Sequence, residues 1–101
     1  MLLFIFYTPT NSVEQVKEAV FQAGAGKIGN YDSCSWMTLG QGQFKPLKDS
    51  NPYIGEQDKI TLVDEYKVEM ICREEVVTDV INALKNAHPY EEPAYHFIKI
   101  E

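Results

Sequence analysis

Residues 60–87 read ITLVDEYKVEMICREEVVTDVINALKNA and contain two different hydrophobic periodicities. In the first half, apolar side chains recur at every second position, which is typical of a strand with one solvated face. These residues are Ile60, Leu62, Tyr66, Val68, Met70 and Cys72. In the second half, Glu74 and Glu75 place negative charge where a helix N-terminus favours it, and an apolar stripe follows at helical spacing. The stripe comprises Val76, Val77, Val80, Ile81 and Leu84. The stretch therefore predicts a long strand followed by a helix that ends near Ala87.

The sequence before this stretch predicts a strand and then a helix. Residues 2–7 (LLFIFY) are a continuous apolar run that Thr8-Pro9 ends, which favours a strand buried on both faces. Apolar residues at helical spacing follow, and the helix should stop at Gly24. Asn11 or Ser12 can cap this helix, and Ser12 with Gln15 has the form of a capping box. The spaced apolar residues are Val13, Val16, Val20 and Ala23.

Two further strands complete the predicted fold. Residues 34–39 alternate well enough for a strand, and residues 94–100 form another near an edge or interface. Between residues 40 and 58, glycines and prolines predict a long mobile connection, with a short strand around Phe44. The order strand-helix-strand-strand-helix-strand predicts an α+β ferredoxin-like plait, with an antiparallel sheet and both helices on one face. We expect residues 1–101 to form a single domain.

The charge and cysteine content exclude several function classes. Nine basic and fifteen acidic residues give a net charge of −6, and the basic residues are scattered singly. Nucleic acids and anionic membranes require clustered positive charge, so neither is an expected partner. The apolar start lacks the basic region of a signal peptide, which favours a cytoplasmic protein. Cys34 and Cys72 have no metal-binding or disulfide spacing, and we expect two buried, reduced thiols.

Residues 24–29 (GAGKIG) match the pattern G-x-G-x-x-G but lie in the wrong context for a dinucleotide site. The pattern follows a helix and leads into a strand, so no helix N-terminus would face the phosphates. A helix C-cap followed by a tight turn is the simpler interpretation. A weaker functional interpretation remains, in which exposed backbone N–H groups beside Lys27 hold a small anion.

Residues 88–93 (HPYEEP) place an imidazole, a phenol and two carboxylates between two prolines. One interpretation is functional: His88, Glu91 or His96 bind a divalent metal such as copper or zinc, or His88 and Glu91 act as acid and base. The other is structural: His88 caps the helix, Tyr90 packs, and the glutamates are solvated. No triad order or phosphate-binding loop accompanies these residues, so we expect a non-enzymatic protein with no cofactor other than a divalent metal.

Five motifs in one order resemble the inserted domain of the Nif-three-like family. The motifs lie at residues 24–31, 34–35, 40–46, 52–55 and 88–95, and the resemblance covers Leu2 to Ile100. It implies a PII-like or CutA-like plait, in agreement with the element order. The family's dinuclear metal site lies in two flanking hydrolase-like halves that have no counterpart here. The resemblance therefore implies a freestanding relative of the insert rather than a hydrolase.

The resemblance also implies an assembly state and a set of site residues. PII and CutA relatives are homotrimers, so we expect a homotrimer with clefts between subunits, open to a small anionic ligand or a protein partner. The candidate cleft residues are Gly26, Lys27, Tyr31, His88, Tyr90, Glu91 and Glu92. Residues 40–58 correspond to the flexible signalling loop of PII-like proteins. The leading expectation is an oligomeric assembly, sensor or regulatory module; the alternatives are a CutA-like metal tolerance protein and a small enzyme.

Overall fold

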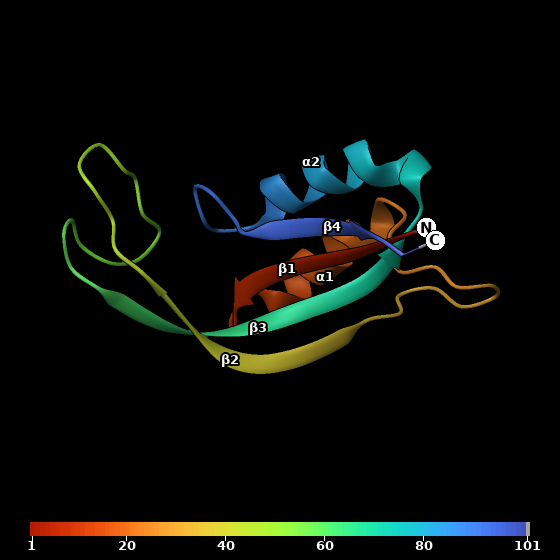
Figure 1. Cartoon of the computed structure of the whole chain (residues 1–101), viewed down its shortest axis with the longest axis horizontal. Coiled ribbons are helices and arrows are strands. Elements are labelled where there is room, and N and C mark those ends of the chain that lie inside the picture. The colour runs from red at the N-terminus through yellow and green to blue at the C-terminus, as the bar shows by residue number, and fades with distance from the viewer. Residues whose placement is uncertain (101) are drawn as a thin grey trace.

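The computed structural model, which describes residues 1–100, is a four-stranded antiparallel sheet with two helices packed on one face (Figure 1). The elements are β1 (Leu2–Pro9), α1 (Val13–Gln22), β2 (Trp36–Phe44), β3 (Thr61–Cys72), the short 3₁₀ helix η1 (Glu74–Val76), α2 (Val77–Ala87) and β4 (Tyr95–Lys99). The strand order is β2-β3-β1-β4, and every neighbouring pair is antiparallel. The predicted ferredoxin-like plait is confirmed, and β4 lies at an edge as expected.

The core lies between the helices and one face of the sheet. Phe4 and Phe6 on β1 are fully buried, and the register places them opposite Met70 and Val68 of β3. Phe4 also stacks on Phe97 of β4, with ring centroids 4.6 Å apart. The helices close this layer with fully buried apolar residues at helical spacing. These residues are Val16, Val20, Val80 and Leu84.

Strand β2 differs from its predicted bounds. It begins at Trp36 rather than residue 34, and it runs without a break to Phe44, where a separate short strand within a mobile connection was expected. Residues 40–44 pair with 61–65 of β3 through backbone hydrogen bonds, which do not require apolar side chains. The connection therefore covers only residues 45–60, and the hairpin extends beyond the helices, giving the molecule extents of 46 × 24 × 23 Å (Figure 1).

The ends of α1 confirm one expectation and correct another. Gly24 follows the helix with a φ of +113°, a conformation that glycine adopts most readily, so the predicted stop is confirmed. The predicted capping box is wrong. The Ser12 hydroxyl donates to the Asn11 side chain, and the Gln15 amide donates 3.1 Å to the carbonyl oxygen of Ala87. Gln15 thus ties α1 to the end of α2 because the helices lie side by side.

The other face of the sheet carries no helix (Figure 1). The register places Leu3 of β1 between Ile71 and Ile98, and Trp36 beside Glu69, on this helix-free face. Trp36 is 69% exposed and Ile98 is 47% exposed. Within residues 1–100, no helix has the length and apolar character needed to cross a membrane.

Candidate functional site

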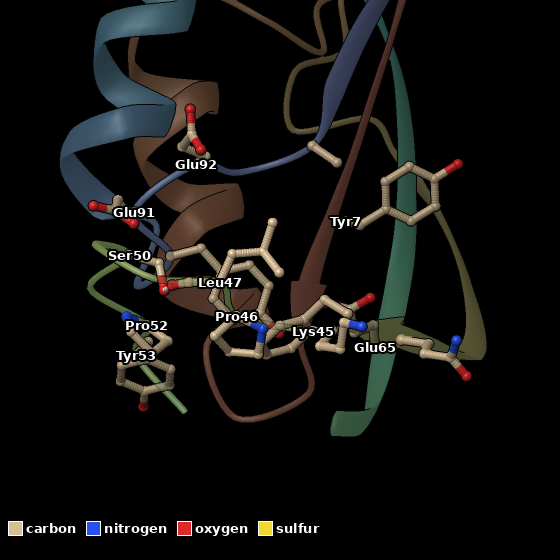
Figure 2. A pocket seen from close by; sticks show the side chains of 14 residues that line it. Tyr7, Lys45, Pro46, Leu47, Ser50, Pro52, Tyr53, Glu65, Glu91 and Glu92 are labelled. Atoms are coloured by element: carbon tan, nitrogen blue, oxygen red, sulfur yellow. Dashed lines mark hydrogen bonds between the residues drawn. The ribbon is translucent and has the colours of Figure 1, made fainter. Parts of the chain in front are cut away.

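Two connections meet at one end of the molecule and enclose a pocket. The connection between β2 and β3 lies beside the one between α2 and β4 (Figure 1), and the backbone N–H of Asn51 donates 3.1 Å to the Glu91 carboxylate. The pocket between them has a volume of about 470 Å³. Figure 2 shows side chains from both connections around it, including Leu47, Tyr53 and Glu91. We call this space the loop pocket; it is lined by residues 43–47, 50, 52–53 and 90–92, with Tyr7, Glu65 and Ala94.

Tyr90 is the central aromatic residue of the loop pocket. Its ring centroid lies 6.0 Å from that of Phe44 and 6.3 Å from that of Tyr53, with the ring planes tilted by 57° and 51°. Its hydroxyl donates a 2.9 Å hydrogen bond to Glu65. Burial raises the pKa of Tyr90 well above its ordinary value, and the hydrogen bond and negative charge of Glu65 add to this effect. The phenol therefore stays protonated and holds the ring in place.

Glu65 reaches Tyr90 because β2 has a glycine where the carboxylate lies. A Cβ atom at Gly42 would overlap the Glu65 carboxylate, so a larger residue would displace it. Glu65 is half-buried, with one oxygen on the Tyr90 hydroxyl and the other against Gly42. This side of the pocket therefore requires a glycine at position 42.

His88 is buried at the end of α2 and uses both ring nitrogens. Nε2 lies 2.6 Å from the carbonyl oxygen of Tyr7, and Nδ1 lies 3.1 Å from the backbone N–H of Tyr90. These partners require the neutral tautomer with the proton on Nε2, which donates to Tyr7 while Nδ1 accepts from Tyr90. Burial lowers the pKa of His88, although the Tyr7 hydrogen bond and Glu65 oppose the shift. His88 therefore joins α2 to β1 and positions Tyr90.

The residues considered for metal binding or acid–base chemistry are not arranged as a common site. His88 has no free lone pair, because Nδ1 accepts from a backbone N–H and Nε2 carries the proton. His96 pairs with Ile5 in the sheet. Its ring and that of Tyr7 are arranged edge to face, with ring centroids 6.3 Å apart. Glu91 lies in the loop pocket instead. Within residues 1–100, no group of three or more His, Cys, Asp or Glu side chains is placed to hold a metal ion.

The glycine loop, residues 24–31, lies at the opposite end of the sheet from the loop pocket (Figure 1). The N–H of Gly26 donates to the Ile71 carbonyl at 2.8 Å, whereas Tyr90 bonds near the other end of β3. Lys27 is exposed, and Tyr31 is 76% exposed. The candidate residues of the glycine loop and those from His88 to Glu92 therefore do not form one site within a single chain. A cleft that combines them across subunits stays a prediction.

The backbone N–H groups that an anion would need are largely engaged within the glycine loop. Those of Gly24 and Ala25 bond to carbonyls of α1, and Ile28 and Tyr31 bond each other at 2.9 Å. The N–H of Gly26 is likewise engaged. This arrangement matches the helix C-cap and tight turn predicted as the simpler interpretation. The N–H groups of these five residues are therefore not free to bind an anion beside Lys27.

The sequence did not single out Glu65, Gly42 or Tyr53 as site residues. Glu65 occupies a polar position of an alternating strand, where the simplest interpretation is a solvated side chain. Only the strand register, with Glu65 opposite Gly40 and Pro9, brings it under Tyr90. Tyr53 sits in a segment read as a mobile connection. A signal was available in the two glycines of β2, since glycine within a strand often marks close approach of another group.

The comparisons with known proteins identify relatives over almost the whole chain. No family model matches the sequence. A protein of Halalkalibacterium halodurans named GTP cyclohydrolase 1 type 2 homolog is 44% identical over 91 residues, which cover 90% of this chain and 24% of the relative. The protein of the same name from Bacillus subtilis is 43% identical over 95 residues, covering 94% of this chain and 26% of the relative.

A solved structure shows which part of such proteins the chain matches. The crystal structure of a Bacillus cereus protein related to NIF3 has a TM-score of 0.83 and 33% identity, covering 99% of this chain and 25% of that one. The chain is a homologue of one segment of NIF3-related proteins. This NIF3-like segment spans about a quarter of the length of these relatives, and the resemblance to the Nif-three-like family is confirmed.

More distant structures show the fold alone. CutA1 from Pyrococcus horikoshii has a TM-score of 0.71 at 17% identity and covers all of this chain and 84% of its own. The PII-like protein CutA from Nostoc has a TM-score of 0.70 at 13% identity, covering all of this chain and 82% of its own. The PII/CutA-like plait expected for the NIF3-like segment is therefore confirmed.

Proposed function

We propose that the chain is a non-enzymatic regulatory module that self-associates as a homotrimer through the helix-free face of its sheet. The observation that carries this proposal is the apolar character of that face. Leu3 lies between Ile71 and Ile98, and Trp36 is largely exposed on the same face. Burying such side chains against a second copy is favourable by about 25 cal/mol per Å² of apolar surface. The PII/CutA-like fold supports a trimer over other assemblies.

The site chemistry supports regulation over catalysis. His88 is neutral and has both nitrogens engaged, and the Tyr90 hydroxyl donates to Glu65. These hydrogen bonds fix the shape of the loop pocket but leave no imidazole lone pair for a general base. The pocket lies between two connections, where a bound molecule can change loop position without a chemical step.

The name of the relatives bears on this proposal only indirectly. GTP cyclohydrolase 1 type 2 homolog names whole proteins about four times as long as the segment they share with this chain. We assign this segment the assembly and regulatory part. A GTP-directed activity of this chain alone would contradict the assignment, and incubation with GTP followed by product analysis tests for it.

Native mass spectrometry of the purified chain tests the assembly. We expect a trimer at micromolar concentration. Ile98→Lys places a charge on the helix-free face and should give monomers, because burying an unpaired ammonium is costly. Leu47→Lys is the matched control, since Leu47 is 60% exposed in the loop pocket rather than on this face. A monomeric wild type, or dissociation by both substitutions alike, would contradict the proposal.

The metal-tolerance alternative is tested on the same preparation. A structural neighbour from Archaeoglobus fulgidus is titled a periplasmic divalent cation tolerance protein CutA, at 20% identity and a TM-score of 0.69. We expect calorimetric titration with copper and zinc to show no saturable site that depends on His88 and Glu91. Saturable binding abolished by the His88→Ala, Glu91→Ala double substitution would instead support the alternative.

A further inference from the structure

We propose that the loop pocket binds a small organic cation, an amine or quaternary ammonium with a short apolar body. The inference rests on the proposed regulatory role for its biological meaning. The pocket itself is formed by a single chain, so it can be tested without reference to assembly. Its volume of about 470 Å³ lies within the range of small-molecule sites.

Aromatic rings form part of the pocket wall. The rings of Phe44 and Tyr53 each lie against Tyr90, and each is tilted by more than 50° to it. Tilted rings do not cover each other's faces as stacked rings do, which leaves π surface for a ligand. A cation within about 6 Å of such a face is attracted by the ring quadrupole, and several rings together recognise quaternary ammonium groups.

The Tyr90 ring is fixed before any ligand arrives. Its backbone N–H donates to His88, its hydroxyl donates to Glu65, and its ring lies 4.9 Å from the His88 ring. Both ends of the residue are therefore held. A wall that is already ordered reduces the conformational entropy lost on binding.

The charges around the pocket favour a cation over an anion or a neutral molecule. Three carboxylates line it, those of Glu65, Glu91 and Glu92, against the single ammonium of Lys45. Gly42 leaves space for the Glu65 carboxylate, and the Asn51 N–H donates to the Glu91 carboxylate. Glu65 is half-buried whereas Glu91 and Glu92 are exposed, so solvent screens the attraction of Glu65 for a ligand cation the least.

The ligand class can be tested with choline and its neutral isostere 3,3-dimethylbutan-1-ol. The two probes have nearly the same shape, and only choline carries a positive charge. In NMR titrations of the full chain, we expect choline to shift the ring resonances of Tyr53 and Tyr90 saturably. The isostere should bind at least about tenfold more weakly, as expected when cation–π and carboxylate attraction dominate. No saturable shift with choline, or equal affinity for the isostere, would overturn the proposal.

Matched variants test whether the named residues form the site. Glu65→Gln removes the charge but keeps an oxygen that can accept from Tyr90, and we expect about tenfold weaker choline binding. Glu74→Gln removes the same charge from the exposed 3₁₀ helix at the other end of α2 and should leave binding unchanged. Tyr53→Leu changes a residue that is 51% exposed, so folding should persist while choline binding weakens. Equal effects of Glu65→Gln and Glu74→Gln would show only a general charge effect and would contradict the site.

The assembly state of the same samples separates this inference from the proposed function. Native mass spectra should show the same subunit number for wild type, Glu65→Gln and Tyr53→Leu, because these residues line the loop pocket rather than the apolar centre of the helix-free face. A monomer that still discriminates choline from its isostere would contradict the assembly proposal alone. A trimer that does not discriminate them would contradict the cation site alone.

Discussion

His88 acts at the scale of a single residue as a neutral link between α2, β1 and Tyr90. Because burial lowers its pKa from the ordinary 6.5, the unfolded chain takes up a proton at a higher pH than the folded chain does. The stability that depends on the neutral ring is fully present above pH 6.5 and is lost as the pH falls through the pKa of the folded state. Lowering the pH therefore destabilises the folded chain through protonation of His88.

The pH dependence of unfolding tests this role of His88. We expect the wild-type free energy of unfolding, measured with urea, to fall below pH 6.5 by up to about 1.4 kcal/mol per pH unit. His88→Gln should flatten this part of the curve, whereas His96→Gln, at an exposed position, should retain the wild-type slope. An unchanged slope in His88→Gln would show that the imidazole is not the group that titrates.

Gly26 has a structural reason to be glycine, which gives a second prediction at this scale. Its φ is +78°, and a Cβ atom there would lie 2.8 Å from the Phe21 ring and 3.0 Å from the Cys34 carbonyl oxygen. Gly26→Ala should therefore lower the free energy of unfolding by about 1 to 3 kcal/mol. Gly40→Ala is the control, since nothing lies within 4 Å of its Cβ position. Equal thermal stabilities of the two variants would contradict this explanation.

At the scale of the elements, α2 is held by its buried face. Val80 and Leu84 are both fully buried against the sheet. Replacing either with Ala should lower the free energy of unfolding by about 1 to 4 kcal/mol, through lost burial and the cavity left behind. Glu74→Gln, at an exposed position, should cost only a few tenths. Chemical denaturation of the three variants measures these changes, and equally mild effects would mean that this helix face does not pack as described.

The elements differ in how well the sequence predicts them, and the reason is physical. Strand β3 and helix α2 were predicted closely because their periodicity reflects which side chains are buried. The end of β2 was missed because Gly40 and Gly42 are held by backbone pairing, which leaves no hydrophobic pattern. The capping box failed because Gln15 has a tertiary partner, Ala87, that spacing along the chain does not reveal.

The candidate site was predicted only in part for a related reason. The segment from His88 to Glu92 stood out because its residue types and prolines are local features. The contacts that complete the loop pocket join residues far apart in the chain, such as Tyr90 with Glu65 and Asn51 with Glu91. These contacts depend on the strand register and on the path of residues 45–60. Neither can be derived from local sequence patterns.

At the scale of the whole molecule, the two faces of the sheet differ in what covers them. One face is closed by α1 and α2 (Figure 1), and the strand register places an apolar strip beside charged residues of β3 on the other face. In a chain of 101 residues, a single core buries a modest share of the surface, so the proposed association through the second face would add to stability. The loop pocket lies at one end of the same sheet.

Trp36 allows the most direct measurement of this assembly, because it is the sole tryptophan of the chain and lies on the helix-free face. In a single chain it is 69% exposed, and its emission should resemble that of a solvated indole and be readily quenched by acrylamide. The account predicts blue-shifted emission, protected from acrylamide, at micromolar concentration, and a solvated, easily quenched indole in Ile98→Lys. Red-shifted, fully quenchable emission from the wild type at every concentration would contradict self-association through this face.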